Sequence, residues 1–183
     1  RVFSECHRVL KDDGVLVFTF HHNKVWAWES IAEILLDAGF YVSATPIVRS
    51  EGKSGYHSSE GNIRYDAVLV CRKQPGSCDG LNEVRQRILN EAIAWTNKTI
   101  ASGMAVNRAD VFTIIMAKSV EHLTKLASAP DGNFERADLR TVLREVGEAV
   151  DEVCTLTAGD QTYSPEMRQL ALLLKEAERR YGK

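Results

Sequence analysis

The first 73 residues alternate between helical and strand-like patterns of hydrophobic positions. A helical pattern ends near Lys11, and an unbroken apolar run follows over residues 15–20. Such a run is typical of a strand buried on both faces. A second helix is expected over residues 26–36, ended by Ala38-Gly39-Phe40, because apolar positions recur there at helical spacing. These positions are Trp28, Ile31, Ala32, Leu35 and Leu36.

Two further strands are predicted after this helix. The first, over residues 41–48, contains Pro46, which is typical of a sheet edge or a strand end. The second, over residues 65–72, follows a polar loop rich in glycine and serine. The helix between the first two strands predicts that they are parallel. The last two strands are joined only by a loop, so they either pair antiparallel or lie apart. Residues 1–73 are therefore expected to form an α/β structure.

The rest of the chain has only helical signals. Residues 74–80, with Pro and two glycines, are typical of a linker. Asn107, followed three residues later by Asp110, resembles a capping arrangement. We therefore divide the chain into an α/β part (1–73), a linker (74–80) and an all-helical extension (81–183). Within the extension, helices are expected over residues 81–102, 108–127, 135–155 and 165–181.

Composition excludes several classes of function. The chain has 183 residues and a net charge of -2, so binding to a polyanion would require a local basic patch. No apolar run approaches the roughly 20 residues that span a membrane, and four cysteines are too few for a secreted disulfide scaffold. A cytoplasmic location is expected. Because the chain opens without Met, inside a helical pattern, we expect it to be a fragment of a longer protein.

Motifs for metal and phosphate binding are missing from the sequence. No cysteine has another Cys or a His at ligand spacing, so no metal site is expected. There is no glycine-rich turn after a strand and no Walker lysine. No serine lies on a Gly-x-Ser-x-Gly elbow, which gives little support to nucleophilic catalysis.

The ends of the first two strands bear the polar residues best placed for function. His21 and His22 follow the first strand, and Ser50 and Glu51 follow the second. Ligands of open α/β sheets bind beyond the carboxyl ends of parallel strands. These four residues are therefore candidates for an active-site rim. In the alternative interpretation, the histidines form a turn that enters the next helix and the loop is merely solvated.

Two other features have both a functional and a structural interpretation. Trp26 and Trp28 face different sides of their helix, so Trp28 is expected in the core and Trp26 near the rim. Core packing is favoured over base stacking for this pair. Arg136, Arg140 and Arg144 form a basic stripe that could contact DNA, but the acidic residues nearby favour a solvated surface.

The first part of the chain resembles a known family. Residues 5–20, Glu-Cys-His-Arg-Val-Leu-Lys-Asp-Asp-Gly-Val-Leu-Val-Phe-Thr-Phe, resemble the R-V-L-K-x-G-G-x-L-V-F step of class I S-adenosylmethionine-dependent methyltransferases. The continuation resembles the final third of the core in large bacterial and archaeal adenine-specific DNA methylases. The resemblance covers residues 1–73. The residues of the continuation that match the family are His21-His22, Trp28, Ala38-Gly39-Phe40, Pro46-Ile47 with Glu51, and residues 68–73.

This resemblance implies a fold and an activity. The three strands would be the fifth, sixth and seventh of a Rossmann-like sheet, in the order 5-7-6, with the last one antiparallel. The parent protein would transfer a methyl group from S-adenosylmethionine to the exocyclic amine of adenine in DNA. In that family a glycine-rich turn after strand one holds the cofactor, and an Asp-Pro-Pro-Tyr element binds the flipped base. This sequence contains neither element, so no catalytic or cofactor-binding residue is assigned, and the fragment alone is expected to be inactive.

Two alternatives stay open at this point. One is a class I methyltransferase that acts on RNA or on a small molecule, and the other is a non-catalytic helical docking or oligomerisation module. In the absence of a fourth strand, the strand at residues 15–20 would have an open apolar edge, which natural sheets avoid. We therefore expect the chain to self-associate through this edge or to cover it with its helical tail.

Overall fold

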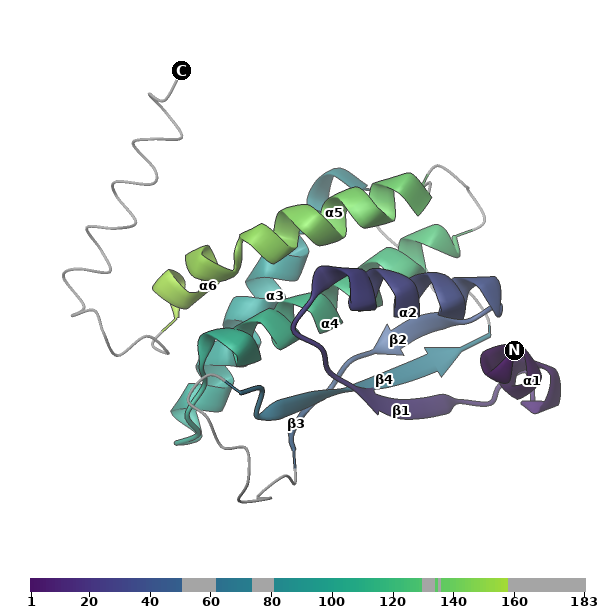
Figure 1. Ribbon diagram of the computed structural model, residues 1–183, viewed down its shortest axis with the longest axis horizontal. Coiled ribbons are helices and arrows are strands. Elements are labelled where there is room, and N and C mark those ends of the chain that lie inside the picture. Colours follow the sequence, from purple (N-terminus) through teal and green to yellow (C-terminus); the bar gives the residue numbers. More distant parts are fainter. Residues whose placement is uncertain (51–61, 74–80, 130–133, 135, 158–183) are drawn as a thin grey trace.

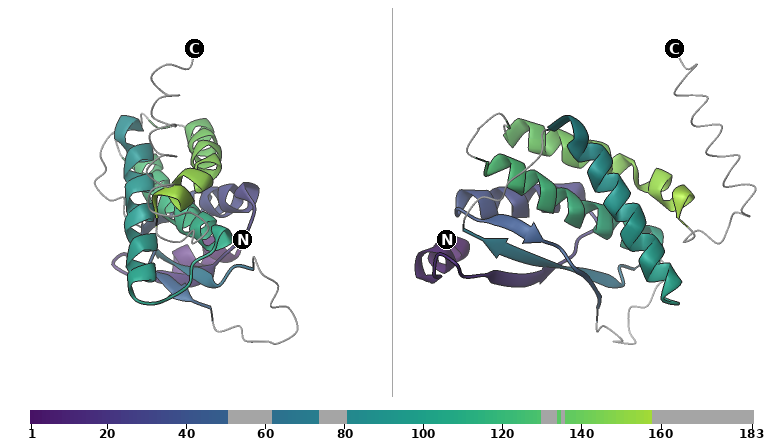
Figure 2. Two further views of the ribbon diagram at one scale, coloured as in Figure 1. Left: turned by 90° about the vertical axis from the view of Figure 1, so that its left-hand side faces the viewer. Right: turned by 180° about the vertical axis from the view of Figure 1, so that it is seen from behind.

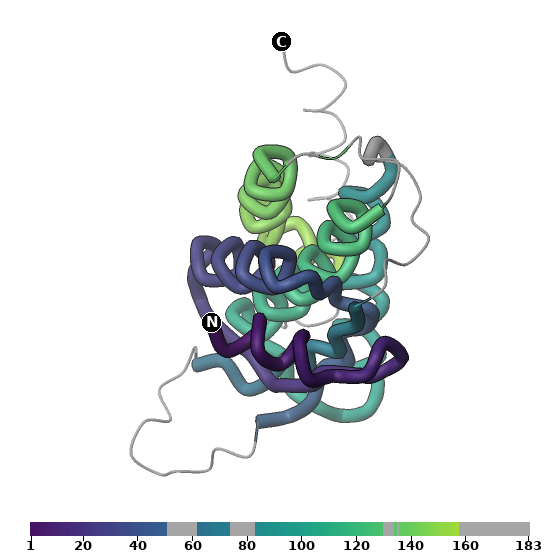
Figure 3. Tube along the Cα trace, turned by 90° about the vertical axis from the view of Figure 1, so that its right-hand side faces the viewer, coloured from purple at the N-terminus to yellow at the C-terminus, as the bar shows by residue number. Residues whose placement is uncertain are grey.

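The protein combines one antiparallel sheet with a set of helices stacked on one of its faces. The computed structural model describes residues 1–50, 62–73, 81–129, 134 and 136–157. In this part of the chain, α2 and α4 cover one face of a four-stranded sheet, and the remaining C-terminal helices pack against them (Figures 1 and 2). The first helix lies at one end of the sheet, the end nearest the viewer in Figure 3. The expected mixed α/β class is confirmed.

The last strand lies in the middle of the sheet. The N-terminal part contains α1 (Val2–Val9), β1 (Leu16–Phe20), α2 (Val25–Asp37), β2 (Tyr41–Ala44), β3 (Ile47–Arg49) and β4 (Tyr65–Arg72). β4 pairs antiparallel with β1 on one side and with β2 and β3 on the other. β1 and β2 are therefore parallel to each other, as the helix between them predicts.

The strand expected over residues 41–48 is divided in two, so the sheet has four strands rather than three. The division falls at Pro46, which has no N–H to donate to the ladder. The carbonyl of Pro46 accepts a hydrogen bond from the amide of Val68 at 2.8 Å, and pairing then resumes at Ile47. The interruption at Pro46 was predicted, and only its consequence for the strand count differs.

The glycine after α2 sets the approach of α1 to this helix. Gly39 has a φ of +83°, the left-handed conformation that commonly ends a helix. A Cβ at this position would lie 2.9 Å from Nε2 of His7 in α1. The predicted helix end at Ala38-Gly39 is therefore confirmed, and the absence of a side chain lets the two helices pack closely.

Burial of residues 15–20 on both faces, which the apolar run predicts, is wrong. Leu16, Phe18 and Phe20 pack against the core, whereas Val17 is 54% exposed. No described element packs on the outer face, so alternate residues of the sheet remain in contact with water. The apolar side chains on this face are Val17, Val48, Val68 and Val70.

The C-terminal part contains four described helices. These are α3 (Leu81–Ala101), α4 (Arg108–Ala127), α5 (Arg136–Glu148) and α6 (Val150–Leu156). The single helix expected over residues 135–155 is divided at Ala149, whose amide bonds to the carbonyl of Val146 in a tighter turn. Gly147 precedes the break, and a Cβ there would lie 3.0 Å from the Val25 side chain. The expected linker (74–80) and last helix (165–181) lie outside the described residues.

The sheet and the C-terminal helices share one hydrophobic core. α4 is the central element, because it contacts β2, β4 and each of α2, α3, α5 and α6. Trp28 of α2 is completely buried in this core, as predicted. The fully buried residues Leu69, Ile114 and Leu143 come from β4, α4 and α5, so the core is continuous from the sheet to the outer helices.

The basic stripe of α5 is a contact between helices. Each of its arginines pairs with a carboxylate on α2, and the two rows of charges have the same four-residue spacing in opposite directions. Because the three arginines pair with carboxylates of α2, the stripe does not fit the interpretation as a solvated surface. It also does not offer three unpaired cations to DNA. Such exposed pairs contribute only about 0–1 kcal/mol each, so they fix the register of the helices more than their stability. The pairs are Arg136–Asp37, Arg140–Glu33 and Arg144–Glu29.

A buried ionic cluster joins α4 to the sheet. Glu121 is 8% exposed and accepts hydrogen bonds from Thr45 Oγ1 at 2.7 Å, Lys125 Nζ at 2.8 Å and Lys118 Nζ at 2.9 Å. Burial by itself would raise the pKa of Glu121. The three hydrogen bonds and the charge of Lys118 outweigh burial and lower this pKa to about 2.

The same cluster extends to α3. Glu91 accepts a hydrogen bond from Nε2 of His122 at 3.0 Å, and its second oxygen lies 3.5 Å from Lys118 Nζ. Burial lowers the pKa of His122, although the nearby charge of Glu91 opposes this effect. The cluster therefore links α3, α4 and the segment between β2 and β3 by charge-assisted hydrogen bonds.

Substitution of Glu121 tests this cluster. We expect Glu121→Gln to lower the free energy of unfolding by about 3–5 kcal/mol, because Lys125 loses its carboxylate partner and Lys118 keeps only the more distant Glu91. The exposed Glu145→Gln on α5 is the matched control and should change stability by less than about 0.5 kcal/mol. Denaturant unfolding followed by circular dichroism at pH 7 measures both values. Equal stability of Glu121→Gln and the unmodified chain would contradict the assignment.

The pH dependence of stability gives a second measurement on these two proteins. The folded-state pKa of Glu121, about 2, lies below its ordinary value of 4.5. Its contribution to stability is therefore complete above pH 4.5 and is lost as the pH falls toward 2, by roughly 3 kcal/mol in total. Glu121→Gln should lack this loss, whereas Glu145→Gln should retain it.

Candidate functional site

The ends of β1 and β3 lie at the same rim of the sheet. β1 ends at Phe20, opposite Ala67, and β3 ends at Arg49, opposite Tyr65. Both ends therefore flank the start of β4, one on each side of it, about 10 Å apart at typical strand spacing. Figure 1 shows this rim at the end of the sheet where β1 leads toward α2. The candidate residues predicted from the sequence follow these two strand ends.

His21 forms a pair with an acidic residue of the middle strand. Its Nδ1 atom is hydrogen-bonded to Oδ1 of Asp66, and the His21 side chain is 51% exposed. A carboxylate at Nδ1 fixes the orientation of the imidazole and leaves Nε2 as the atom that can meet a ligand or exchange a proton. The sequence analysis missed Asp66. The available signal was an aspartate inside an otherwise apolar strand, where this residue type is depleted.

His22 stabilises the turn that leads into α2. Its Nδ1 accepts a hydrogen bond from the Lys24 amide at 3.0 Å, and its carbonyl accepts one from Nε1 of Trp28 at 2.9 Å. The imidazole also packs with its edge toward the Trp26 ring, with the centroids 5.0 Å apart. For His22 the geometry thus fits the helix-entry interpretation, whereas His21 is directed to the rim.

Ser50 continues the ladder beyond β3. Its amide donates a hydrogen bond to the carbonyl of Arg64 at 2.9 Å, and its Oγ atom is buried with no hydrogen-bond partner among the described residues. No described hydrogen bond joins Ser50 to either histidine. Glu51 lies outside the described residues.

The start of α4 holds this rim in place. Asp110, completely buried, accepts hydrogen bonds from the amides of Arg64 at 2.6 Å and Asn107 at 2.9 Å. The second bond belongs to the predicted capping arrangement, which the structure confirms as a capping box. The hydroxyl of Tyr65 donates to the carbonyl of Ala105 at 3.1 Å.

Burial also shifts the acidities of two groups at this rim. It raises the pKa of the Asp110 carboxyl, and the hydrogen bonds from the two amides oppose that shift. Burial and the neighbouring charge of Asp110 raise the pKa of Tyr65, while Arg49 and Arg64 act in the opposite direction. These two side chains therefore act as structural anchors, and the exposed groups of the rim are left for contact with a ligand.

Among the described residues of the rim, the exposed charge is positive. Lys24, Arg49 and Arg64 are exposed, and none of them forms an ion pair with a described carboxylate. Among the described residues of the rim, the acidic side chains of Asp66 and Asp110 are both engaged in hydrogen bonds. A local excess of positive charge thus occurs on a chain whose net charge is negative.

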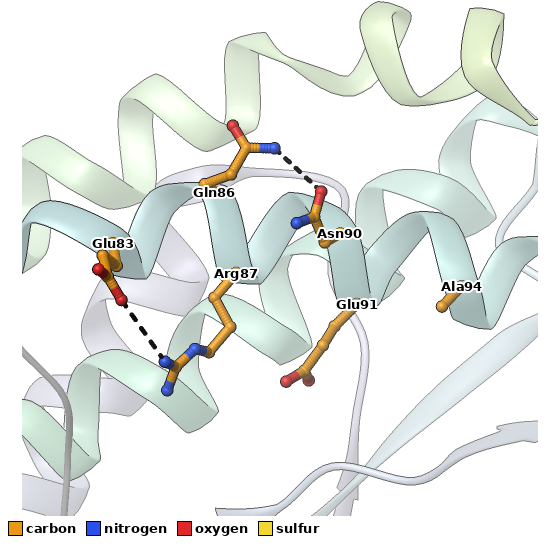
Figure 4. A pocket seen from close by; sticks show the side chains of 6 residues that line it. All are labelled: Glu83, Gln86, Arg87, Asn90, Glu91 and Ala94. Carbon is orange, nitrogen blue, oxygen red and sulfur yellow. Dashed lines mark hydrogen bonds and ion pairs between the residues drawn. The ribbon is translucent and has the colours of Figure 1, made fainter.

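A concavity along α3 has no comparable chemistry. Its polar side chains largely bind one another, because Glu83 pairs with Arg87 and Gln86 donates to Asn90 at 2.9 Å (Figure 4). The described residues that line it include no histidine, cysteine or aromatic ring. We therefore place the candidate site at the strand ends. The lining residues of the α3 concavity are Glu83, Gln86, Arg87, Asn90, Glu91 and Ala94.

Comparison with known proteins does not identify a relative. The chain matches no protein-family model, no curated protein and no solved structure. Within the described ranges, no three His, Cys, Asp or Glu side chains are arranged to hold a metal ion, and no helix has the length and apolar character needed to cross a bilayer. Burial raises the pKa of the Cys71 thiol to about 12, so this group is not a nucleophile at neutral pH.

The anchoring role of Asp110 can be tested directly. Asp110→Ala removes the acceptor for two part-buried amides, and we expect a loss of about 2–3 kcal/mol in the free energy of unfolding. The amide of Arg64 should also exchange faster with solvent, because its partner is lost. Asp13→Ala, at an exposed position before β1, is the control and should change neither quantity. Unchanged protection of the Arg64 amide in Asp110→Ala would refute the anchor.

Proposed function

We propose that this chain is the C-terminal part of a class I S-adenosylmethionine-dependent methyltransferase that methylates the exocyclic amino group of adenine in DNA. The observation that supports this proposal is the position of β4, the last strand, antiparallel between two strands that are parallel to each other. In the proposed correspondence β1 is strand five, β2 and β3 together are strand six, and β4 is strand seven. The resemblance of residues 1–73 to adenine-specific DNA methylases supplies the reaction and the substrate.

The exposed side of β1 is consistent with a larger sheet. β1 pairs only with β4 among the described strands, so its second edge has unpaired backbone groups. Val17 on this strand is 54% exposed, and Val15 just before it is 38% exposed. A fourth strand in the parent protein would pair with this edge. The apolar character of β1, which is poorly suited to water, supports such a neighbour.

We propose that the described residues of the rim do not themselves bind S-adenosylmethionine. The turn after β1 is His21-His22-Asn23-Lys24 and contains no glycine. The acidic side chains at the rim, Asp66 and Asp110, are already bound, so neither is available to a ribose hydroxyl. We therefore assign the cofactor and the target base to residues upstream of Arg1, and the proposed contribution of this chain is one wall of the rim.

The parent protein provides the test of the proposed activity. The residues that precede Arg1 in the natural protein should include an Asp-Pro-Pro-Tyr or Asn-Pro-Pro-Tyr motif. Protein that contains them should transfer a labelled methyl group from S-adenosylmethionine to adenine in DNA, whereas the 183-residue chain should transfer none. Alanine at the first motif position is the control and should abolish transfer.

Two results would contradict the proposal. Transfer to RNA or to a small molecule, without transfer to DNA, would favour another class I methyltransferase. Tight binding of S-adenosylmethionine to the 183-residue chain alone, measured by calorimetry, would show that the cofactor site was placed wrongly.

The open edge of β1 generates a separate prediction. The 183-residue chain should self-associate in sedimentation velocity, because two β1 edges can pair with each other. Val17→Lys should reduce this association by placing a charge on the exposed strand. Val2→Lys is the matched control, since Val2 is 74% exposed on α1 and the same change there should have no effect. A monomeric unmodified chain at all concentrations would refute the prediction.

A further inference from the structure

The rim also contains an exposed tryptophan. Trp26 is 61% exposed, whereas Trp28, two residues later on α2, is completely buried. A single exposed apolar side chain is common on protein surfaces, so exposure alone assigns no role. Two further observations distinguish Trp26. The turn beside it is held by hydrogen bonds and ring contacts, and cations that pair with no described carboxylate lie at the same rim.

Hydrogen bonds and ring contacts hold the turn beside Trp26. The carbonyl of His22 is bound to the Trp28 indole, whose ring packs edge-on against Phe20 with centroids 4.8 Å apart. The amide of Lys24 donates to the His22 ring, which itself packs against Trp26 at an angle of 63°. An aromatic side chain in a fixed setting loses little conformational entropy when a planar group stacks on it.

The surrounding charge selects the kind of ligand. Lys24, Arg49 and Arg64 are exposed and form no ion pair with a described carboxylate. Lys24 lies in the turn after β1, Arg49 ends β3 and Arg64 directly precedes β4, so the three come from the strand ends that define the rim. Cations spread around an aromatic platform are typical of sites for single-stranded nucleic acid, where phosphates meet the cations and bases stack on the ring. The bases of an intact duplex already stack on one another and cannot offer a face to Trp26.

We propose that this basic–aromatic rim, formed by Lys24, Trp26, Arg49 and Arg64, binds an unpaired stretch of DNA. A base stacks on the Trp26 indole, and the backbone phosphates contact the three cations. The choice of DNA over RNA rests on the proposed function. In a protein that extrudes a base from the duplex, such a rim would hold the strand that base extrusion leaves unpaired.

Fluorescence anisotropy with the 183-residue chain tests the inference. The probes are a fluorescein-labelled single-stranded DNA of mixed sequence, its duplex, and an RNA strand of the same sequence, each titrated at several salt concentrations. The unmodified chain should bind the single DNA strand more tightly than either of the other probes. The affinity should fall as salt increases, because phosphate contacts release counterions.

Two substitutions separate stacking from charge. Trp26→Ala should weaken binding about tenfold without changing the salt dependence, and Trp26→Phe should retain most of the affinity. Lys24→Gln should weaken binding and reduce the slope of log affinity against log salt by about 0.7. Arg72→Gln removes the same charge at the opposite end of β4 and should change neither quantity. If Trp26→Ala proves less stable in thermal unfolding, Trp26→Met keeps the apolar bulk without a π face and should show the same loss of binding.

Several outcomes would overturn this inference. For the unmodified chain, they are the absence of DNA binding, equal affinity for duplex and single strand, and RNA binding as tight as DNA binding. For the variants, they are wild-type affinity of Trp26→Ala and equal losses of affinity in Lys24→Gln and Arg72→Gln.

Methyl transfer by the parent protein distinguishes a failure of this inference from a failure of the proposed function. If the parent methylates adenine while Trp26→Ala binds normally, only the present inference is wrong. If the rim binds DNA as described and the parent does not methylate DNA, only the proposed function is wrong.

Discussion

Burial of α4 is the constraint on which most of this structure depends. The helix runs between the sheet and the other helices, so polar side chains within it need partners inside the protein, and each unpaired buried group would cost about 1–3 kcal/mol. Glu121 is met by Thr45 after β2, and Thr124 accepts the Val42 amide of β2 itself at 2.9 Å. Glu91 of α3 reaches the helix from its other side. These contacts specify where the sheet and α3 lie relative to α4. Asp110 at the start of α4 binds the amide of Arg64, directly before β4.

Described helices cover only one face of the sheet, and the edge formed by β1 has no described partner strand. Its inner face is covered by α2 and α4, while the outer face and the second edge of β1 have no described cover. The proposed function gives this asymmetry a physical reason, because β1 would be an internal strand of a longer sheet. The candidate rim is complete on the side formed by β1, β3 and the start of β4, and it exposes His21 and three cations there. In this part of the described structure, exposed charge, a carboxylate–histidine pair and an exposed aromatic ring occur together.

Much of the fold could be predicted because its signals are local. The helical spacing of apolar residues in α2, the glycine after α2 and the Asn107–Asp110 pair each depend on neighbours in the chain, and each was found from the pattern alone. The errors arose where distant segments decide the outcome. Ala149 breaks a helix beside the contact of Gly147 with Val25, and Val17 is exposed because nothing described packs on its face of the sheet. Neither contact has a signal within the local sequence.

In the candidate site too, local sequence determined some features and contacts between distant segments determined the others. Sequence alone determined that His21, His22, Ser50 and Glu51 follow strand ends, because the hydrophobic pattern locates the strands and therefore their ends. Only tertiary structure decided what these residues do. Strand pairing brings Asp66 to His21 from 45 residues away, and the turn geometry commits His22 to backbone and ring contacts. The basic stripe of α5 became an ion-pair ladder because α2 presents carboxylates at the same spacing. A pattern along the chain identifies which residues are polar, but the partner of each depends on which segments fold against it.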